Sequence, residues 1–244
     1  MRFRVTSLNL EQDHKRWDQR RPLIESEIAR LKPDILALNE VCVPRQTARS
    51  LWRGMGEAFH LVQQTRVNGL ADVEGEALIT RFPVVETANL DYCARDMVAL
   101  VARLLVDGSP IDVYVTHLYM SRGEDSLRLH QVQRLLAWIR ERDDVPARIV
   151  CGDFNATIET PSAALMASCF QPTQSGPTAF TPLADSDGTV SHPYWPRMDR
   201  CIDYVWIAGA LKLKESGVCF NRPSPDDASL WPSDHAGVWA DLTV

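Results

Sequence analysis

The sequence lacks the features that would place it in several common classes of protein. None of its six cysteines forms a CxxC pair, so a zinc knuckle is not expected. No apolar run approaches the roughly 20 residues that cross a bilayer, and the first residues read as a strand rather than as the apolar core of a signal peptide. We therefore expect a cytoplasmic protein with reduced cysteines and no stable membrane insertion.

An excess of positive charge is also missing. Lys and Arg number 26 against 32 Asp and Glu, which gives a formal net charge of −6. Because nonspecific binding to nucleic acid is dominated by neutralisation of phosphate with Lys and Arg, this balance disfavours broad, sequence-independent binding. It leaves room for a nuclease with a local basic groove, and part of the acidity can belong to a metal site.

No linker and no internal repeat divides the 244 residues, so we expect a single domain over residues 1–244. The clearest helix is predicted over Ser126–Glu141, where one face is apolar, and Asp107-Gly108 is the turn of a predicted hairpin. Strands outnumber helices, and the pattern is not a regular βαβ repeat. The sequence therefore predicts an α+β protein with two packed, mostly antiparallel sheets and helices outside them.

The bounds of the other predicted segments come from apolar runs and from the prolines and glycines that interrupt them. The stretch 171–200 is rich in Pro, Ser, Thr and Asp and is predicted to be a long loop of a kind that is often functional. The remaining elements are strands at 2–10, 35–38, 77–80, 84–87, 97–106, 111–116, 148–151, 202–207 and 236–242, and helices at 22–31 and after Pro44.

Polar side chains follow or interrupt two of these apolar strands. The segment Gly-Asp-Phe-Asn at 152–155 directly follows an apolar run, and its spacing puts Asp153 and Asn155 on one side of an extended chain. Asp203 lies inside an apolar strand. A buried carboxylate is costly without a histidine, an arginine or a metal beside it, so Asp203 is a strong candidate for a functional pair.

Other polar residues repeat this placement. Asn9 follows the first strand, and Glu40 and His117 end two others. Asp234 and His235 stand just before the last strand, where an extended chain would point them in opposite directions, one to a metal and the other to the substrate or to Asp203. Taken singly, Asn9 reads as a turn residue and His117 as a core histidine. Together, these positions predict one shared cleft, because chance would not often place acids, amides and imidazoles in this way.

The order of these motifs is itself informative. They are Asn9, Leu38-Asn39-Glu40-Val41, Arg81-Phe82-Pro83, Thr116-His117-Leu118, Gly152-Asp153-Phe154-Asn155, Ile202-Asp203-Tyr204-Val205 and Ser233-Asp234-His235. This order resembles the endonuclease/exonuclease/phosphatase superfamily, which has the deoxyribonuclease-I-like fold, and it covers nearly the whole chain. The sequence departs from the family at Asn39, where glutamine is usual; the shorter amide is expected to shift a supporting hydrogen bond while Glu40 stays in place.

The resemblance implies a four-layer α/β sandwich and a Mg²⁺ or Mn²⁺ cofactor. Glu40 would hold the metal, with Asn9 and Asp234 close to it. Hard divalent cations prefer oxygen ligands, and they neutralise the charge by which a phosphodiester repels anionic nucleophiles.

The resemblance also assigns the catalytic roles. His235, oriented by Asp203, would activate or position the attacking water, and Asp153 would help to position that water or the leaving oxygen. His117 and Asn155 would hydrogen-bond the phosphoryl oxygens. The division of proton transfers between His117, Asp153 and His235 stays open.

The substrate is a phosphate ester of a class that the motifs leave open: nucleic acid, lipid or small phosphoester. His117 disfavours an abasic-site repair enzyme, because family members that act on abasic DNA typically lack histidine there. As a hypothesis, His192, Tyr194, Trp195 and Trp231 line the substrate mouth, where they would stack on a base or cover an acyl chain. The alternative is that they pin long loops to the core. Arg81 and Arg95 are candidate phosphate contacts, for which structural pairing is an equal alternative.

The leading interpretation is a monomeric phosphodiesterase or nuclease that hydrolyses its substrate by in-line attack of water. One alternative is a hydrolase directed at phospholipid, sphingomyelin or inositol phosphate. An alternative of another class is a catalytically silent binding module on the same fold. The intact set of acids, amides and imidazoles speaks against this last interpretation.

Overall fold

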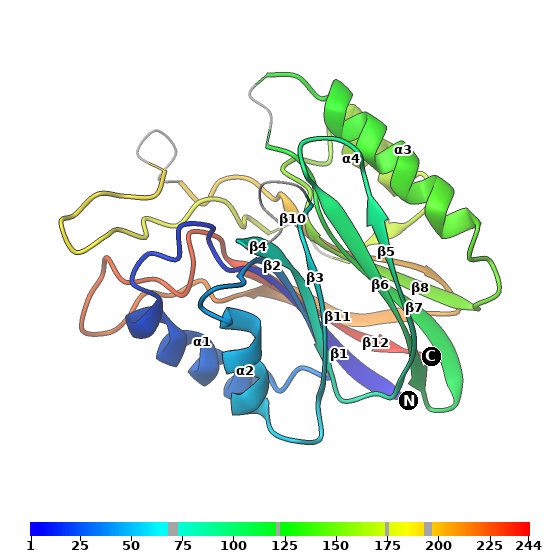
Figure 1. Cartoon of the computed structure of the whole chain (residues 1–244), viewed down its shortest axis with the longest axis horizontal. Coiled ribbons are helices and arrows are strands. Elements are labelled where there is room, and N and C mark those ends of the chain that lie inside the picture. The colour runs from blue at the N-terminus through cyan, green and yellow to red at the C-terminus, as the bar shows by residue number, and fades with distance from the viewer. Residues whose placement is uncertain (68–72, 121–122, 174–175, 193–196) are drawn as a thin grey trace.

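The computed structural model describes residues 1–67, 73–120, 123–173, 176–192 and 197–244, and in them two six-stranded sheets pack face to face (Figure 1). The first sheet has β1 (Arg2–Asn9), β2 (Ile35–Cys42), β3 (His60–Thr65), β4 (Glu74–Thr80), β11 (Lys212–Cys219) and β12 (Gly237–Thr243), in the order β11-β12-β1-β2-β4-β3. The second has β5 (Val84–Asp91), β6 (Val98–Val106), β7 (Ser109–His117), β8 (Ala147–Asp153), β9 (Gln171–Pro172) and β10 (Asp203–Gly209), in the order β5-β6-β7-β8-β10-β9.

Helices cover the outer face of each sheet. The apolar sides of α1 (Trp17–Leu31) and α2 (Thr47–Met55) pack on the first sheet, and those of α3 (Ser126–Arg140) and α4 (Pro161–Ala167) pack on the second. Figure 1 shows the two pairs of helices on opposite sides of the sandwich. A third apolar cluster fills the space between the sheets, with Val5, Leu100 and Val115 fully buried in it. The predicted four-layer sandwich is confirmed.

Both sheets are mixed but mainly antiparallel, as predicted. Each contains one parallel pair among its described strands, β1 with β2 and β7 with β8. The predicted hairpin joins β6 and β7, and its turn residues Asp107 and Gly108 both have positive φ, as a type I′ turn requires.

Four elements were missed by the sequence analysis, namely β3, β11, α4 and the two-residue β9, and α1 begins five residues before the predicted start at Pro22. β3 and β11 are edge strands with polar, half-exposed residues, so they lack the apolar runs by which strands were recognised. α4 is a single short helix capped by Thr160, whose hydroxyl accepts from the backbone N–H of Ala163. Stretch 171–200 is mostly irregular in its described part, apart from β9 and isolated bridges. In the described part of the chain, no helix combines the length and the apolar character needed to cross a membrane.

Candidate active site

Strand ends from both sheets meet at one edge of the sandwich. In the first sheet β1 and β2 run parallel, so that Asn9 pairs with Asn39 close to their carboxyl ends, and the antiparallel β4 and β12 begin at the same edge. In the second sheet the parallel β7 and β8 end together, with His117 opposite Asp153. The antiparallel β10 begins there, with Asp203 opposite Asp153.

A cleft of about 300 Å³ opens between these strand ends. Asn9 and Asp203 lie behind its lining and reach it through hydrogen bonds to Glu40 and His235. Of the residues predicted to act in catalysis or metal binding, those that line the cleft directly are Glu40, His117, Asp153, Asn155, Asp234 and His235. The shared cleft expected from the sequence is therefore present.

A β-bulge aims Glu40 into the cleft. The register between β2 and β4 shifts after Leu38, so that two residues of β2, Asn39 and Glu40, face Glu76 alone. Glu40 has φ 54°, a left-handed conformation that is uncommon for glutamate. In a regular strand the side chains of Asn39 and Glu40 would lie on opposite faces of the sheet. The bulge breaks this alternation, so that both side chains lie at the edge where the strand ends meet.

Asn39 joins the two sheets behind the cleft. Its Nδ2 donates to Glu76 Oε2 (2.5 Å) and to the carbonyl of Thr116 (3.0 Å), and its Oδ1 accepts from the backbone N–H of Asp153 (3.0 Å). Asparagine, in place of the usual glutamine, thus still supports the chain beside Glu40. Gly152 permits this approach, because a Cβ at its φ of 139° would lie 1.8 Å from the Thr116 oxygen.

His235 is held by the buried aspartate that the sequence singled out. Its Nδ1 is 2.9 Å from Asp203 Oδ2, and its Nε2 turns toward Asp153 Oδ2 at 3.8 Å. Burial alone would lower the pKa of His235, but the carboxylates of Asp203 and Asp153 outweigh that effect and raise it well above its ordinary value. The predicted Asp203–His235 pair is present.

His117 has a different partner. Its Nδ1 is 2.9 Å from the guanidinium of Arg66, which is 95% buried and ion-paired with Glu74. Burial, together with the charge of Arg66, lowers the pKa of His117 well below its ordinary value. On the other side of the ring, the amide nitrogen of Asn155 lies 3.1 Å from Nε2. The two residues predicted to contact phosphoryl oxygens are therefore adjacent.

The acid-rich part of the cleft suits a hard divalent ion. Burial, with the charges of Glu74 and Asp234 added to it, raises the pKa of Glu40 well above its ordinary value. Asn9 Nδ2 donates to one oxygen of Glu40 at 3.0 Å, and among the described residues no donor engages the other oxygen. A cation there would relieve the repulsion and complete the coordination of an open carboxylate oxygen, so the donor set fits Mg²⁺ or Mn²⁺. Among the described residues, two groups have possible ligand atoms within 4.8 Å of one another: Glu40 with Glu74 and His117, and Asp153 with Asp203 and His235.

Asn9 and Asp234 were predicted to lie close to the metal, but protein groups already occupy some of their oxygen atoms. Asn9 presents Nδ2 to Glu40 and to Asp153 Oδ2 (3.2 Å), because its oxygen accepts the backbone N–H of Glu11. Asp234 Oδ2 accepts from His192 at 2.7 Å. Asn9 therefore orients the carboxylates, and Asp234 retains only its remaining lone pairs for a metal.

Comparison with known proteins agrees with this geometry. A family model described as the endonuclease/exonuclease/phosphatase family matches residues 6–235. This chain belongs to the endonuclease/exonuclease/phosphatase family. Membership supports the assignment of the chain as a phosphoester hydrolase, in line with the resemblance seen in the sequence motifs.

Individual relatives in the family are distant. Nocturnin of Xenopus laevis is 28% identical over 262 aligned residues, which cover 93% of this chain and 65% of that protein. Carbon catabolite repressor protein 4 homolog 3 of Arabidopsis thaliana is 29% identical over 174 residues, 66% of this chain and 38% of that protein. The chain thus spans less than two thirds of the length of these curated relatives.

Solved structures of the family share the whole fold. The human nocturnin catalytic domain with bound sulfate superposes with a TM-score of 0.76 at 25% identity, covering 99% of this chain and 93% of that one. A family member from Bacteroides vulgatus gives a TM-score of 0.80 at 17% identity, covering 100% and 99%. At 17% identity, the similarity to the Bacteroides vulgatus structure shows a shared fold and says nothing about function.

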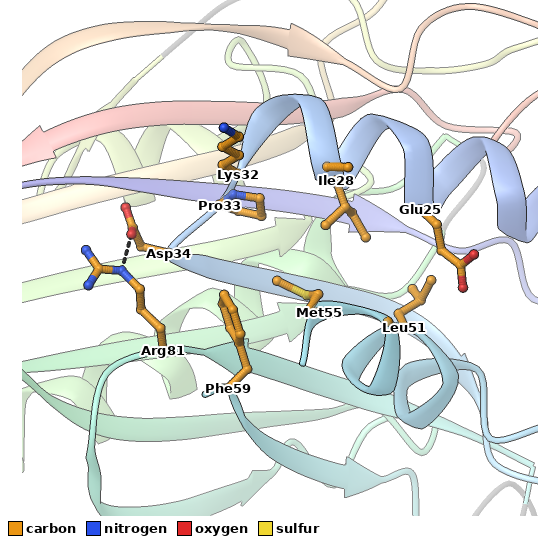
Figure 2. Close-up of a pocket in the computed structure, with 11 residues that line it drawn as sticks. Glu25, Ile28, Lys32, Pro33, Asp34, Leu51, Met55, Phe59 and Arg81 are labelled. Carbon is orange, nitrogen blue, oxygen red and sulfur yellow. Dashed lines mark hydrogen bonds and ion pairs between the residues drawn. The ribbon is translucent and has the colours of Figure 1, made fainter. Parts of the chain in front are cut away.

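Arg81 lies apart from the cleft. It follows the far end of β4, seven residues beyond Glu74, and a strand of that length spans roughly 20 Å. Its guanidinium pairs with Asp34 beside a larger, mostly apolar cavity of about 510 Å³ between α1 and α2 (Figure 2). This cavity holds none of the clustered acids and imidazoles found at the other edge. The structural pairing that was the alternative for Arg81 is present.

Trp195 and Tyr194 lie outside the described residues. Of the other aromatic residues expected at the mouth, His192 is in the cleft, with its ring stacked on Phe180 at a centroid distance of 3.9 Å. Phe180 in turn meets the ring of His235 edge-on at 5.0 Å. Part of the long loop thus packs against His235. Trp231 is outside the cleft lining, and its indole N–H donates to the Ala228 carbonyl at 3.0 Å.

Several supporting residues were missed from the sequence. Arg66 and Glu74 hold His117, and Glu76 holds Asn39. Arg20 is fully buried and donates to the carbonyls of Leu10 (3.0 Å) and Pro232 (2.8 Å), which ties the end of β1 to the Ser-Asp-His segment. Charged residues in polar stretches are usually exposed, so the sequence offered no signal for the burial of these side chains.

Proposed function

We propose that this protein hydrolyses phosphodiesters with Mg²⁺ or Mn²⁺, with a water molecule attacking in line with the leaving oxygen. The observation that supports this most strongly is the pair of His235 and Asp203, 2.9 Å apart, directly beside the acid-rich part of the cleft. A divalent ion supplies charge neutralisation of the phosphate when it is bound.

The residues of the chain divide the remaining work. Asp203 accepts from His235 Nδ1, which fixes the ring and turns Nε2 toward Asp153, where it can position the attacking water and carry a proton. Burial, with the nearby charge of Asp203, raises the pKa of Asp153 to about 7, so this carboxyl can exchange a proton near neutral pH. His117 and Asn155 lie together on the opposite side, where donors can stabilise the phosphoryl oxygens as charge develops.

The charge of the cleft favours a diester over a monoester. Among its described lining residues the arginines are Arg66 and Arg95, and Arg66 is already paired with Glu74. A diester carries one negative charge at neutral pH and a monoester carries nearly two. A cleft with several carboxylates, in which Arg95 is the lining arginine without an ion pair to a described residue, therefore suits the diester.

The rim of the cleft indicates where the rest of the substrate lies. The guanidinium of Arg95 stands 5.3 Å from the ring centroid of Tyr119, and both residues line the cleft. This cation and aromatic face suit a further phosphate next to a base, as in a nucleic-acid strand. Met120, which is 51% exposed at the same rim, would instead favour an acyl chain, so a lipid ester is the second candidate.

A substrate panel tests the proposal. Purified protein is assayed with Mg²⁺, Mn²⁺ or EDTA on bis-p-nitrophenyl phosphate, p-nitrophenyl phosphate, single- and double-stranded DNA, RNA, inositol phosphates and sphingomyelin micelles. We expect metal-dependent cleavage of diesters, abolished by EDTA and by Glu40→Gln. The exposed Glu57→Gln is the matched control and should behave as the wild type.

The same panel separates the alternatives. Turnover of inositol phosphates or p-nitrophenyl phosphate alone would replace the diesterase with a phosphatase, and turnover of micelles alone would select the lipid ester. Absence of metal-dependent turnover on every substrate would indicate a silent binding module.

A further inference from the structure

The partner of His117 determines which of its ring nitrogens carries hydrogen. Arg66 places a guanidinium nitrogen 2.9 Å from Nδ1. A guanidinium has five N–H donors, no acceptor, and a proton that it does not release in proteins. The Asn155 amide nitrogen on the other side of the ring is also a donor, so a neutral ring can accept from only one of the two groups. The guanidinium is charged and is therefore the stronger donor, so Nδ1 accepts from Arg66 through its lone pair and the ring hydrogen lies on Nε2.

The position of Arg66 is itself fixed by the first sheet. Its side chain pairs with Glu74, and its backbone N–H donates to the Glu74 carbonyl at 2.8 Å, which extends the pairing of β3 with β4. Both side chains are more than nine-tenths buried. Gly75 allows the two strands to approach here, since a Cβ would lie 2.1 Å from the Gln64 oxygen. The arginine is thus held on a rigid support.

The Nε2 hydrogen then points to a shared acceptor position. The Asn155 amide nitrogen, 3.1 Å from Nε2, already donates one hydrogen to the Leu118 carbonyl at 2.9 Å. With hydrogen on both nitrogens, their contact is not a hydrogen bond, and both are free to donate to a third atom. Asp153 Oδ2 at 3.6 Å and Glu40 Oε1 at 3.8 Å are too distant from Nε2 to satisfy it.

We infer that Arg66 is a positioning residue that fixes His117 as a neutral Nε2–H donor, so that His117 and Asn155 together bind one phosphoryl oxygen and His117 takes no proton from water. The inference rests on the proposed function for the identity of the oxygen. It resolves the division of proton transfers left open by the motifs, because proton exchange then falls to His235 and Asp153.

The direct test reads the tautomer of His117 by long-range ¹H–¹⁵N NMR of the full-length protein, with and without Mg²⁺. We expect the neutral pattern with hydrogen on Nε2 in both conditions, and assign the signal by its loss in His117→Gln. An Nδ1–H pattern or an imidazolium at neutral pH would overturn the inference. This readout does not need turnover, so it remains decisive even if every substrate of the panel fails.

Variants test whether Arg66 acts through His117. Because Arg66→Met would leave Glu74 buried and unpaired, the variant to use is Arg66→Met with Glu74→Gln, compared with Glu74→Gln alone and with the exposed control Arg53→Met. We expect kcat on the best substrate to fall about a hundredfold in the double variant, with KM changed less, as for loss of one oxyanion donor.

The conservative change gives the matching rescue. In Arg66→Lys, Glu74 favours the ammonium form, which has donors and no acceptor, so this variant should keep hydrogen on Nε2 and recover most of kcat. A double variant with wild-type kcat, or one that loses activity while His117 keeps the Nε2–H pattern, would contradict a role for Arg66 in setting the tautomer.

Discussion

His117 and His235 face the same cleft, yet their Nδ1 atoms meet groups of opposite charge. His117 ends β7 in the second sheet and is held by Arg66, which follows β3 in the first. His235 precedes β12 in the first sheet and is held by Asp203 at the start of β10 in the second. Each imidazole is thus fixed from the other sheet, so correct packing of the sandwich is what assembles both.

The consequence for chemistry is a division of roles. A carboxylate accepts from Nδ1 of His235 and raises its pKa, which leaves Nε2 able to carry a proton to and from the cleft. A guanidinium donates to Nδ1 of His117 and favours its neutral form, which leaves Nε2–H as a fixed donor. Under the proposed function, the same residue type would serve proton transfer on one wall and oxygen binding on the other.

The largest expected effect comes from breaking the His235 side. Asp203→Asn would favour the wrong tautomer of His235 without removing its bulk, and we expect kcat to fall by roughly 10⁴-fold. Steady-state kinetics on a diester measure this, with the exposed Asp143→Asn as the control. A loss of less than tenfold would show that this pair does not carry the chemistry.

The next effect belongs to the His117 side. Asn155→Ala removes one of two donors to the phosphoryl oxygen, and we expect kcat to fall by about 10²–10³-fold with KM little changed. Combined with the Arg66→Met, Glu74→Gln variant, the losses should be less than additive, because both disturb one donor pair. Strict additivity in the double-mutant cycle would separate Asn155 from His117.

A smaller effect is expected at the rim, outside both histidine pairs. Arg95→Ala should raise KM by roughly tenfold for an oligonucleotide, since a charge-assisted hydrogen bond contributes about 1.5–3 kcal/mol before screening by solvent. KM for bis-p-nitrophenyl phosphate should stay the same, because that substrate lacks a second phosphate. Equal changes on both substrates would remove Arg95 from a second phosphate position.

One further expected effect is on stability rather than on activity. Burial raises the pKa of Glu76 to about 8, so the folded protein keeps a proton that the unfolded chain releases above about pH 4.5. The stability from this group is complete below that pH and is lost as pH rises to about 8. Glu76→Gln has no such proton to lose. The free energy of unfolding of the variant minus that of the wild type should therefore increase with pH, by up to about 1.4 kcal/mol per pH unit over this range. Urea titrations in EDTA measure the difference; a constant value would contradict the shift.

The sequence anticipated the proton-transfer side better than the oxygen-binding side. Asp203 stood out because a lone acid in an apolar strand demands a partner, and His235 lies 2.9 Å away. His117 and Asp153 were likewise expected in one cleft, because apolar runs reveal where buried strands stop. In the structure β7 and β8 are parallel and end with these two residues opposite each other.

What escaped the sequence were features set by tertiary packing. Arg66 follows the half-exposed edge strand β3, and its burial depends on contact with β4 and β7. The bulge that turns Glu40 inward depends on the register between β2 and β4, which no local pattern records. Arg81 belongs to a motif but lies at the other end of its strand, so its place in the motif carried no information about the cleft.

The most direct test of the metal-centred cleft is the position of Mn²⁺ in crystals, read from its anomalous scattering. We predict a peak against the open oxygen of Glu40, on the side of the cleft nearest Asp234, that disappears in Glu40→Gln. A peak confined to Asp153, Asp203 and His235, or no bound Mn²⁺ at concentrations that support turnover, would contradict the account.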